Sequence, residues 1–466
     1  MQRNDVVKGV FIAVPLAVLC LLYGLWLVMD TPAYVESMIV GGTILLLFVW
    51  LFIQFVPRVF DFVMGAEEEQ LPSAVRRTST IGARELLRLV CMLAIGRGIF
   101  MLGAFLWSLY LNGYTETVFE IQHIWADHLY AGRIISIANK GYALEAADLT
   151  GKYYNLLFPP FYSLIVRLLS PFYLSSIRAG FFVANINAVL SGVVLYLLVL
   201  HDSDRRSAVR AVWYYAILPP SFLLTCTIPA STFLLLSLLS VYCARRQYFV
   251  FSSVLGAMAA LTERVGIVLV IPLLLEFFNA MTKEYRSLEE VTWRFYLKKG
   301  LVGATFILVP LGFMAYLIIN RLVGGSFFTY VGYLEELYDS RFALFYRVCG
   351  VQMEKFLDAY RIYDASRAYG TYLPNLLFAA GSLVLILAKG KELRVSYIAY
   401  FVACYAAILS QTGIMDAPRQ LFCCFPIMMA LMRLTKKRWV DLLMSLLCIA
   451  GSVVYLGMYV AGWQVV

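Results

Sequence analysis

Apolar runs of about twenty residues recur along the whole chain and alternate with short polar segments. An α-helix needs about twenty apolar residues to cross the hydrocarbon core of a bilayer. By this criterion the chain has about thirteen candidate spans, near 9–29, 38–56, 89–112, 177–200, 208–225, 229–243, 249–262, 265–280, 301–320, 373–388, 395–411, 419–433 and 439–461. The pattern predicts an all-α, polytopic integral membrane protein with about thirteen transmembrane helices.

The composition agrees with a membrane protein and excludes a soluble domain. The 466 residues are 62% hydrophobic and 14% charged, whereas a soluble domain carries about a quarter charged residues. The net charge is +9, but the Lys and Arg residues lie in short clusters between apolar runs and form no basic face. This distribution argues against nucleic acid as a partner. The lipid bilayer is the expected partner.

The basic clusters also predict the orientation of the spans. All of them fall on one side of the membrane if the spans alternate, and the positive-inside bias makes that side the cytoplasm. The clusters are Arg58, Arg76, Arg77 and Arg84; Arg205, Arg206 and Arg210; Arg245 and Arg246; residues 283–299; Lys389, Lys391 and Arg394; and Lys436, Lys437 and Arg438. The N-terminus is then cytoplasmic, and the two long loops, 113–176 and 321–372, lie on the outer face.

Both outer loops are only partly polar. Loop 113–176 interleaves isoleucines with charged side chains, as in Ile134, Ile135 and Ile137 beside Arg133, which predicts interfacial helices. Loop 321–372 is rich in Tyr. Its rings suit the aromatic belt at the membrane surface, and they would equally suit stacking against sugar rings.

The chain divides into two parts. Residues 1–87 are expected to form two additional N-terminal transmembrane helices plus a cytoplasmic linker, and residues 88–466 the core. The first apolar run is too long for an ordinary cleaved signal peptide, so we expect it to be retained. The chain contains no Asn-x-Ser/Thr acceptor site for N-glycosylation. This favours a bacterial cytoplasmic membrane.

Loops on the outer face favour chemistry on a lipid-linked substrate. Cytosolic nucleotide sugars do not reach that face, whereas a lipid-phosphate carrier presents its sugar there. Transfer needs a carboxylate that takes a proton from the acceptor hydroxyl and a cation near the departing phosphate. Asp127 is the candidate base, because a carboxylate at an apolar interface has a raised pKa. A helix-capping or Arg-paired aspartate is the simpler alternative.

Other charged residues interrupt apolar stretches at expected outer turns. Glu263 and Arg264 form one such pair, and Asp416 with Arg419 forms another. Because arginine binds phosphate in a bidentate manner, Arg264 and Arg419 are candidates for donor phosphate binding. Glu263 is a candidate for substrate binding, although a simple loop ion pair would also explain it.

Three further features complete the candidate chemistry. His128 beside Asp127 is a candidate for substrate contact, since the His spacing fits no zinc motif. Arg97 lies within a span, where structural pairing is the favoured explanation. The nine Cys residues lie mostly inside apolar runs and have no metal-ligand spacing. No acidic cluster marks a divalent-metal site either, so neither a metal nor another cofactor is expected.

Short motifs in the core occur in a recognisable order. They are Trp125, Asp127 and Tyr130; Ile137-Ala138-Asn-Lys-Gly141-Tyr142; Leu157-Phe158-Pro159-Pro160-Phe161-Tyr162; Gly256-Ala-Met-Ala-Ala-Leu-Thr-Glu-Arg-Val-Gly266; and Pro418-Arg419-Gln-Leu-Phe422. Over roughly residues 88–440 this order resembles the PIG-V type of mannosyltransferase, the GPI mannosyltransferase 2 family with bacterial relatives, in the GT-C superfamily. The chain departs from the family pattern at Ala126, which separates Trp125 from Asp127, and at Glu263, where the family has Arg.

The resemblance implies a GT-C-type fold, a polyprenyl- or dolichyl-phosphate mannose donor and an inverting transfer with Asp127 as base. Tyr130 and Tyr142 would shape the first outer loop and contact substrate. We therefore expect an outer-face glycosyltransferase that moves a sugar, mannose by the resemblance, to a lipid or glycan acceptor. Two alternatives stay open: a lipid-linked oligosaccharide polymerase or ligase that uses a diphosphate carrier, and a transporter of lipids or solutes that is not an enzyme.

Overall fold

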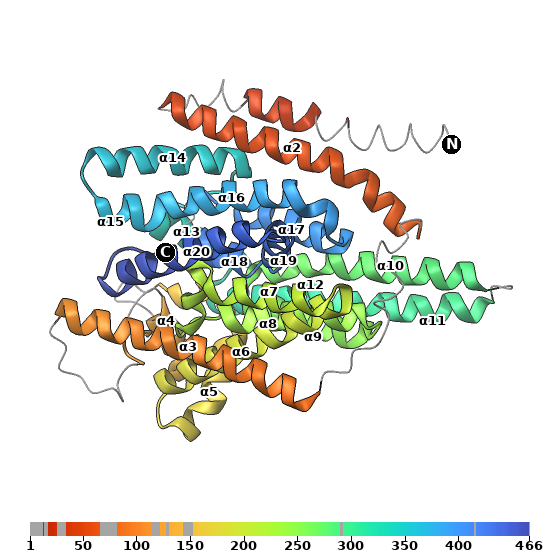
Figure 1. The fold of residues 1–466 in the computed structure, drawn as a ribbon, viewed down its shortest axis with the longest axis horizontal. Helices are drawn as coiled ribbons and strands as arrows, with labels where there is room; N and C mark the ends of the chain where they lie inside the picture. The colour runs from red at the N-terminus through yellow and green to blue at the C-terminus, as the bar shows by residue number, and fades with distance from the viewer. Residues whose placement is uncertain are drawn as a thin grey trace.

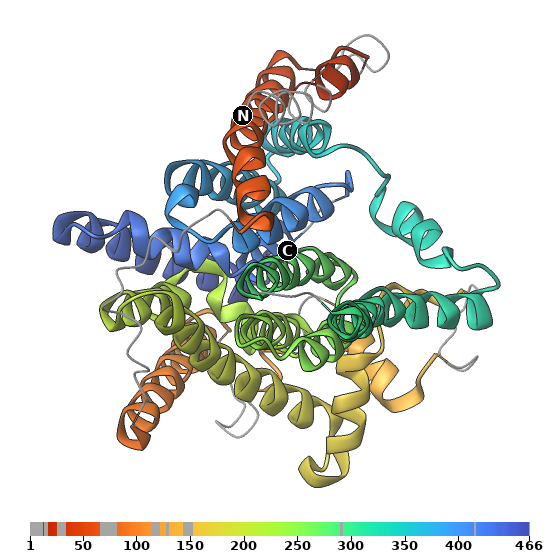
Figure 2. The same cartoon turned by 90° about the vertical axis from the view of Figure 1, so that its right-hand side faces the viewer.

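A computed structural model describes residues 13, 17–25, 34–65, 82–112, 122–126, 130–142, 152–288, 292–413 and 416–465. These residues form helices and no strand; a single isolated β-bridge pairs Phe342 with Gln411. The long helices run roughly side by side (Figure 1), and the perpendicular view looks nearly along them (Figure 2). The all-α, polytopic membrane class predicted from the apolar runs is confirmed.

The helices are named as in Figure 1 and have the following bounds. They are α2 (Val35–Val63), α3 (Ala83–Asn112), α4 (Ala131–Lys140), α5 (Phe161–Tyr173), α6 (Ser176–Asp202), α7 (Arg205–Ile217), α8 (Ala230–Arg245), α9 (Phe249–Thr262), α10 (Val270–Ser287), α11 (Trp293–Ala304), α12 (Leu308–Gly324), α13 (Thr329–Tyr338), α14 (Phe345–Arg361), α15 (Ala365–Arg367), α16 (Leu373–Lys389), α17 (Val395–Ile408), α18 (Ala417–Phe422), α19 (Pro426–Leu434) and α20 (Arg438–Val460). Short 3₁₀ turns cover Tyr154–Leu157, Pro219–Thr225, Arg264–Leu269, Thr305–Ile307 and Gly390–Glu392, and a π-helical turn covers Ala368–Tyr372.

Seven helical segments in the described part of the chain are long and apolar enough to cross a membrane. They are Val35–Val63, Ala83–Leu111, Ser176–Asp202, Arg264–Ser287, Trp293–Gly324, Ala365–Glu392 and Arg438–Val460. An eighth is possible if Pro219–Thr225 and Ala230–Arg245, which meet at a bend of 103°, count as one broken span. The count of about thirteen therefore stays a prediction.

The difference in count comes from short or broken helices. Two expected spans, near 249–262 and 395–411, are the 14-residue helices α9 and α17. Two others, near 208–225 and 419–433, are interrupted close to Pro219-Pro220 and Pro426, since proline lacks the N–H that continues a helix. Much of α17 is buried within the protein, and a helix covered by protein need not match the bilayer thickness.

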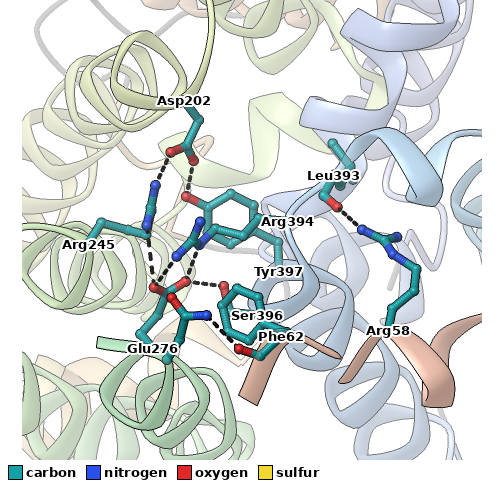
Figure 3. A network of polar contacts seen from close by, with 10 residues as sticks. Arg58, Phe62, Asp202, Arg245, Glu276, Leu393, Arg394, Ser396 and Tyr397 are labelled. Carbon is teal, nitrogen blue, oxygen red and sulfur yellow. Dashed lines mark hydrogen bonds and ion pairs between the residues drawn. The ribbon is translucent and has the colours of Figure 1, made fainter. Parts of the chain in front are cut away.

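A buried polar network joins four helices (Figure 3). Arg394 donates to Glu276 through Nε (2.6 Å) and Nη2 (2.9 Å), and Arg245 donates to the same carboxylate at 3.4 Å. Arg245 also pairs with Asp202, which accepts a hydrogen bond from Tyr397. The network ties α6, α8 and α10 to the first residues of α17.

The residues expected on the two sides of the membrane separate onto opposite ends of the bundle. Arg394, from an expected cytoplasmic cluster, immediately precedes α17, and Ile408, next to an expected outer turn, ends it. Fourteen helical residues place these ends about 20 Å apart. Arg58 of α2 joins the Arg394 end by donating to the Leu393 carbonyl at 3.1 Å. Which end faces the cytoplasm stays a prediction.

Both loops expected on the outer face contain helices where the chain is described. Loop 113–176 contains α4 and α5, and loop 321–372 contains α13 and α14. Helix α4 buries Ile134, Ile137 and Ala138, the spacing of an amphipathic helix. Helix α13 has no buried residue and lies at the periphery of the bundle (Figure 2, turquoise). The predicted division between residues 87 and 88 falls inside α3 and stays a prediction.

Candidate active site

A cavity of about 740 Å³ lies at the end of the bundle opposite the Glu276–Arg394 network. Segments far apart in the sequence form its wall: the start of α4, the turn before α5, the bend before α8, the break between α9 and α10, α13, and the residues that join α17 to α18. The lining residues are Ala126, Tyr130, Gly132, Arg133, Leu157, Phe158, Pro159, Pro229, Glu263, Arg264, Val265, Leu334, Tyr338, Ile408, Gln411, Gly413, Asp416, Arg419 and Gln420. The volume is within the usual range for a small-ligand site, about 300–1,000 Å³.

The break between α9 and α10 places two charged side chains in this wall. Glu263 ends α9 with extended backbone (φ −140°, ψ 140°), and a 3₁₀ turn begins at Arg264. A Cβ at Gly266 would lie 2.5 Å from the carbonyl carbon of Ala259. The turn can therefore pack this closely against α9 only with glycine at position 266.

Arg419 is the centre of a buried ion cluster. Its Nε donates to Asp416 Oδ2 at 2.9 Å and its Nη1 to Glu263 Oε1 at 2.8 Å, and a second contact joins Nη2 to Asp416 Oδ2. Burial lowers the pKa of Arg419, but the negative charges of Asp416 and Glu263 raise it well above the ordinary value. The guanidinium stays charged, and two carboxylates compensate it.

Arg133 and Arg264 differ from Arg419 because neither forms an ion pair with a carboxylate in the described part of the chain. Both are half-buried in the cavity wall. The Arg264 guanidinium lies 5.3 Å from the centre of the Tyr330 ring and donates to the Leu157 carbonyl at 3.1 Å. The Arg133 guanidinium lies 5.3 Å from the ring centre of Tyr154. Within the described residues, no carboxylate compensates the charge of these two cations.

Aromatic side chains and proline complete the wall. The rings of Tyr130 and Phe158 stack with their centres 4.7 Å apart, and the Arg419 guanidinium lies 5.5 Å from the Tyr130 ring centre. Burial raises the pKa of Tyr130 well above that of an ordinary phenol, although Arg419 lowers it. The Tyr130 hydroxyl is therefore protonated at neutral pH.

Tyr142 lies behind the wall rather than in it. Its hydroxyl donates to the Phe158 carbonyl, and the Tyr316 hydroxyl donates to the Leu156 carbonyl. With Arg264 on Leu157, three donors hold three consecutive carbonyls before Pro159. Tyr142 thus holds the loop from behind and is not among the residues that line the cavity, and its contact with substrate stays a prediction.

Asp127 and His128 lie outside the described residues, and their roles stay predictions. Their described neighbours, Ala126 and Tyr130, both line the cavity. The segment before them is anchored: the Thr227 N–H donates to the Trp125 carbonyl at 3.1 Å. The Trp125 ring is fully buried and stacks 5.7 Å from that of Tyr459.

Four of the predicted site residues are therefore brought together: Tyr130, Glu263, Arg264 and Arg419. Arg133 and Gln420 were not predicted as site residues from the sequence, and Asp416 was predicted only as the partner of Arg419. Spacing on α4 could have indicated Arg133, which lies three residues after Tyr130 and thus on the same helical face. Among the described residues, no group of three His, Cys, Asp or Glu side chains could hold a metal ion. The expectation that no metal is required stays a prediction.

No protein-family model and no curated protein matches the sequence. The structure is similar to that of ArnT from Cupriavidus metallidurans bound to undecaprenyl phosphate, with 14% identity over 73% of this chain and 74% of that chain and a TM-score of 0.41. It is also similar to the Archaeoglobus fulgidus oligosaccharyltransferase tethered to an acceptor peptide, with 11% identity, 82% and 55% coverage and a TM-score of 0.37. This chain thus spans just over half of the oligosaccharyltransferase. Likenesses this distant carry no argument about the site, whose interpretation rests on the cavity.

Proposed function

We propose that this protein is a membrane glycosyltransferase with a GT-C-type fold and that the cavity is its active site. It would transfer a sugar, mannose by the sequence resemblance, from a polyprenyl-phosphate donor to a lipid or glycan acceptor on the outer face. The observation that carries the proposal is that two arginines, Arg133 and Arg264, share one cavity with the Glu263–Arg419–Asp416 cluster and pair with no carboxylate of the described residues.

The reaction needs a base and a stabilised leaving group. The acceptor oxygen attacks the anomeric carbon of the donor sugar, and the bond from that carbon to the phosphate oxygen breaks. Polyprenyl phosphate leaves with the electron pair and gains one negative charge. Asp127 is proposed to take the proton of the acceptor hydroxyl, and the configuration at the anomeric carbon is inverted.

The arginines have separate parts in this scheme. Charge develops on the departing phosphate, so cations already in position lower the barrier. Arg264 is the sequence-based candidate for this task, and the absence of a carboxylate partner among the described residues supports that role. Arg133 joins it on the same ground. Arg419 was also proposed as a phosphate ligand, but the two carboxylates that it binds favour a role in holding the acidic side of the cavity.

The test is mass analysis of lipid-linked and surface glycans from cells with and without the protein, and with the Asp127→Asn variant. Asp127→Asn should abolish the product while membrane insertion stays normal. Asp339→Asn is the control, because Asp339 is exposed and its backbone has φ of 46°, which asparagine tolerates. Full transfer by Asp127→Asn would remove that residue from the mechanism.

Comparing donors separates the two alternatives. Incorporation from a diphosphate-linked glycan but not from a monophosphate-linked hexose would identify a polymerase or ligase. Movement of a lipid or solute across reconstituted vesicles without a new glycosidic bond would identify a transporter. No contact in the cavity favours either alternative over the monophosphate donor.

A further inference from the structure

Glu263 and Arg264 are consecutive residues that serve different walls of the cavity. In extended backbone, neighbouring side chains point to opposite faces, and Glu263 is extended. Glu263 reaches Arg419 on α18, whereas Arg264 reaches the Leu157 carbonyl and the Tyr330 ring. The single break between α9 and α10 therefore gives the cavity an acidic wall at Glu263 and a basic wall at Arg264.

The carboxylates of Asp416 and Glu263, which form the acidic wall, differ in how many of their oxygens accept hydrogen bonds. Both oxygens of Asp416 accept hydrogen bonds, Oδ2 from Arg419 and Oδ1 from Gln420. Glu263 accepts from Arg419 through Oε1 at 2.8 Å, and its Oε2 accepts no hydrogen bond from any described residue. The Glu263 side chain is 18% exposed and lines the cavity. Oε2 thus has no hydrogen-bond donor among the described residues, on a side chain that Arg419 holds in the cavity wall.

The direction of this acceptor is set by Arg419. The guanidinium of Arg419 is only 5% exposed, binds both carboxylates and lies against the Tyr130 ring. Each of these contacts restricts its position, and the ion pair transmits that restriction to Glu263. Arg419 is therefore a positioning residue for the acidic wall.

We propose that Glu263 determines which donor sugar is accepted, by taking a hydrogen bond from a sugar hydroxyl at Oε2 while the basic wall holds the phosphate. This inference rests on the proposed function and deepens it. A carboxylate accepts but does not donate, so the site suits a neutral, hydroxyl-bearing hexose. A deoxy sugar leaves Oε2 without a donor, and a uronic acid brings a second negative charge beside it.

The experiment measures binding, because the acceptor is not identified. The full chain in lipid nanodiscs is titrated with polyprenyl phosphate, with polyprenyl-phosphate mannose and with its four monodeoxy analogues, and the dissociation constants are determined by native mass spectrometry. A hydrogen bond to a charged group corresponds to a change of about 10- to 100-fold in affinity. The wild-type chain should lose about this factor with one of the deoxy analogues.

The Glu263→Gln variant should bind that deoxy analogue and polyprenyl-phosphate mannose with dissociation constants within about threefold of each other. It should bind polyprenyl phosphate that carries no sugar as tightly as the wild type does. Glu335→Gln on α13 is the control, since Glu335 is exposed and pairs only with Arg341. Arg419→Lys should also reduce the discrimination between the two sugars. If it lowers affinity for every probe equally, its role is structural rather than positioning.

The outcomes separate the inference from the proposed function. A wild-type chain that binds neither polyprenyl phosphate nor its mannose conjugate contradicts the proposed function itself. A chain that binds both, loses both with Arg264→Ala, and discriminates among deoxy analogues equally well with Glu263→Gln overturns only the role of Glu263.

Discussion

Arg97 of α3 and Ser221 are 124 positions apart, and Arg97 Nη1 donates a 2.6 Å hydrogen bond to the Ser221 carbonyl. The guanidinium is 6% exposed and also donates to the Tyr215 hydroxyl at 3.3 Å. Its partners Ser221, Thr225 and Tyr215 are uncharged and lie in the 3₁₀ turn Pro219–Thr225 or on α7 just before it. Structural pairing is the favoured explanation for this charge, and these contacts support it because the arginine joins α3 to both elements.

Replacing Arg97 should therefore destabilise the break rather than the chemistry. Arg97→Met removes the hydrogen bonds to the Ser221 carbonyl and the Tyr215 hydroxyl, and a hydrogen bond from a charged donor contributes about 1.5–3 kcal/mol. The thermal unfolding midpoint of the purified protein should fall, and donor affinity should fall only as far as the folded fraction does. Arg88→Met, on the exposed side of the same helix, should leave the midpoint unchanged. Equal midpoints for the two variants would contradict the role of Arg97.

The fold could be predicted where a helix faces lipid. The expected spans near 38–56 and 439–461 correspond to α2 and α20, because lipid requires a long apolar helix. The prediction counted the segments near 249–262 and 395–411 as spans, and the structure forms them as the 14-residue helices α9 and α17. In α17, Phe401 and Tyr405 are fully buried among other helices, and such contacts replace lipid without fixing a length. Hydropathy cannot distinguish a protein environment from a lipid environment.

The site could be predicted where charge is costly. Glu263, Arg264 and Arg419 were selected because charged residues rarely interrupt apolar sequence without a reason, and all three line one cavity. The sequence could not show that Arg419 binds Glu263, 156 positions away. It also could not show that Tyr142 lies behind the loop rather than in the cavity. Which residues form ion pairs, and which side of a loop faces a cavity, depend on the fold and not on the local sequence.

Arg264 and Arg133, which pair with no carboxylate of the described residues, are proposed to bind the phosphate of the donor, so removing either should weaken donor binding. Arg264→Ala and Arg133→Ala should each raise the dissociation constant for polyprenyl phosphate by about 10- to 100-fold, since each removes one cation from the basic wall. The loss should be the same with and without an attached sugar. Arg321→Ala, on the exposed end of α12, provides the control. Unchanged binding of polyprenyl phosphate in the double variant would show that the phosphate binds elsewhere.

The network at the other end of the bundle should contribute stability without affecting the donor. Glu276→Gln leaves Arg394 with a neutral partner in a buried site and Arg245 with Asp202 as its remaining carboxylate, a change that costs about 3–5 kcal/mol. Glu284→Gln lies on the same helix but breaks an exposed pair with Lys299, which is worth about 0–1 kcal/mol. Chemical unfolding in detergent measures both. Similar losses for the two variants would mean that the buried network is not a stabilising one.

The contact between α13 and the segment before α5 should depend on pH. Glu336 accepts from Lys152 and from the Tyr154 hydroxyl, and the Tyr153 N–H donates to the Tyr333 hydroxyl at 3.2 Å. Chiefly the hydrogen bond from Lys152 lowers the pKa of Glu336, and the bond to Glu336 raises the pKa of Lys152. Helix α13 has no buried residue, so these contacts are its main attachment to that segment.

The sign of the dependence follows from these shifts. A carboxyl whose pKa is lowered on folding stabilises the contact above its unfolded pKa, about 4.3, and this stabilisation is lost as the pH falls through the lower, folded value. Lysine contributes below about pH 10 and stops contributing at still higher pH. Hydrogen exchange of residues 329–338, corrected for the intrinsic rate, should therefore be constant from pH 5 to 8 and rise below about pH 4. Glu336→Gln should exchange faster at neutral pH and lose the acid-dependent rise, whereas Glu335→Gln should behave as the wild type. Slow exchange of α13 in Glu336→Gln would show that other contacts hold this helix over the cavity.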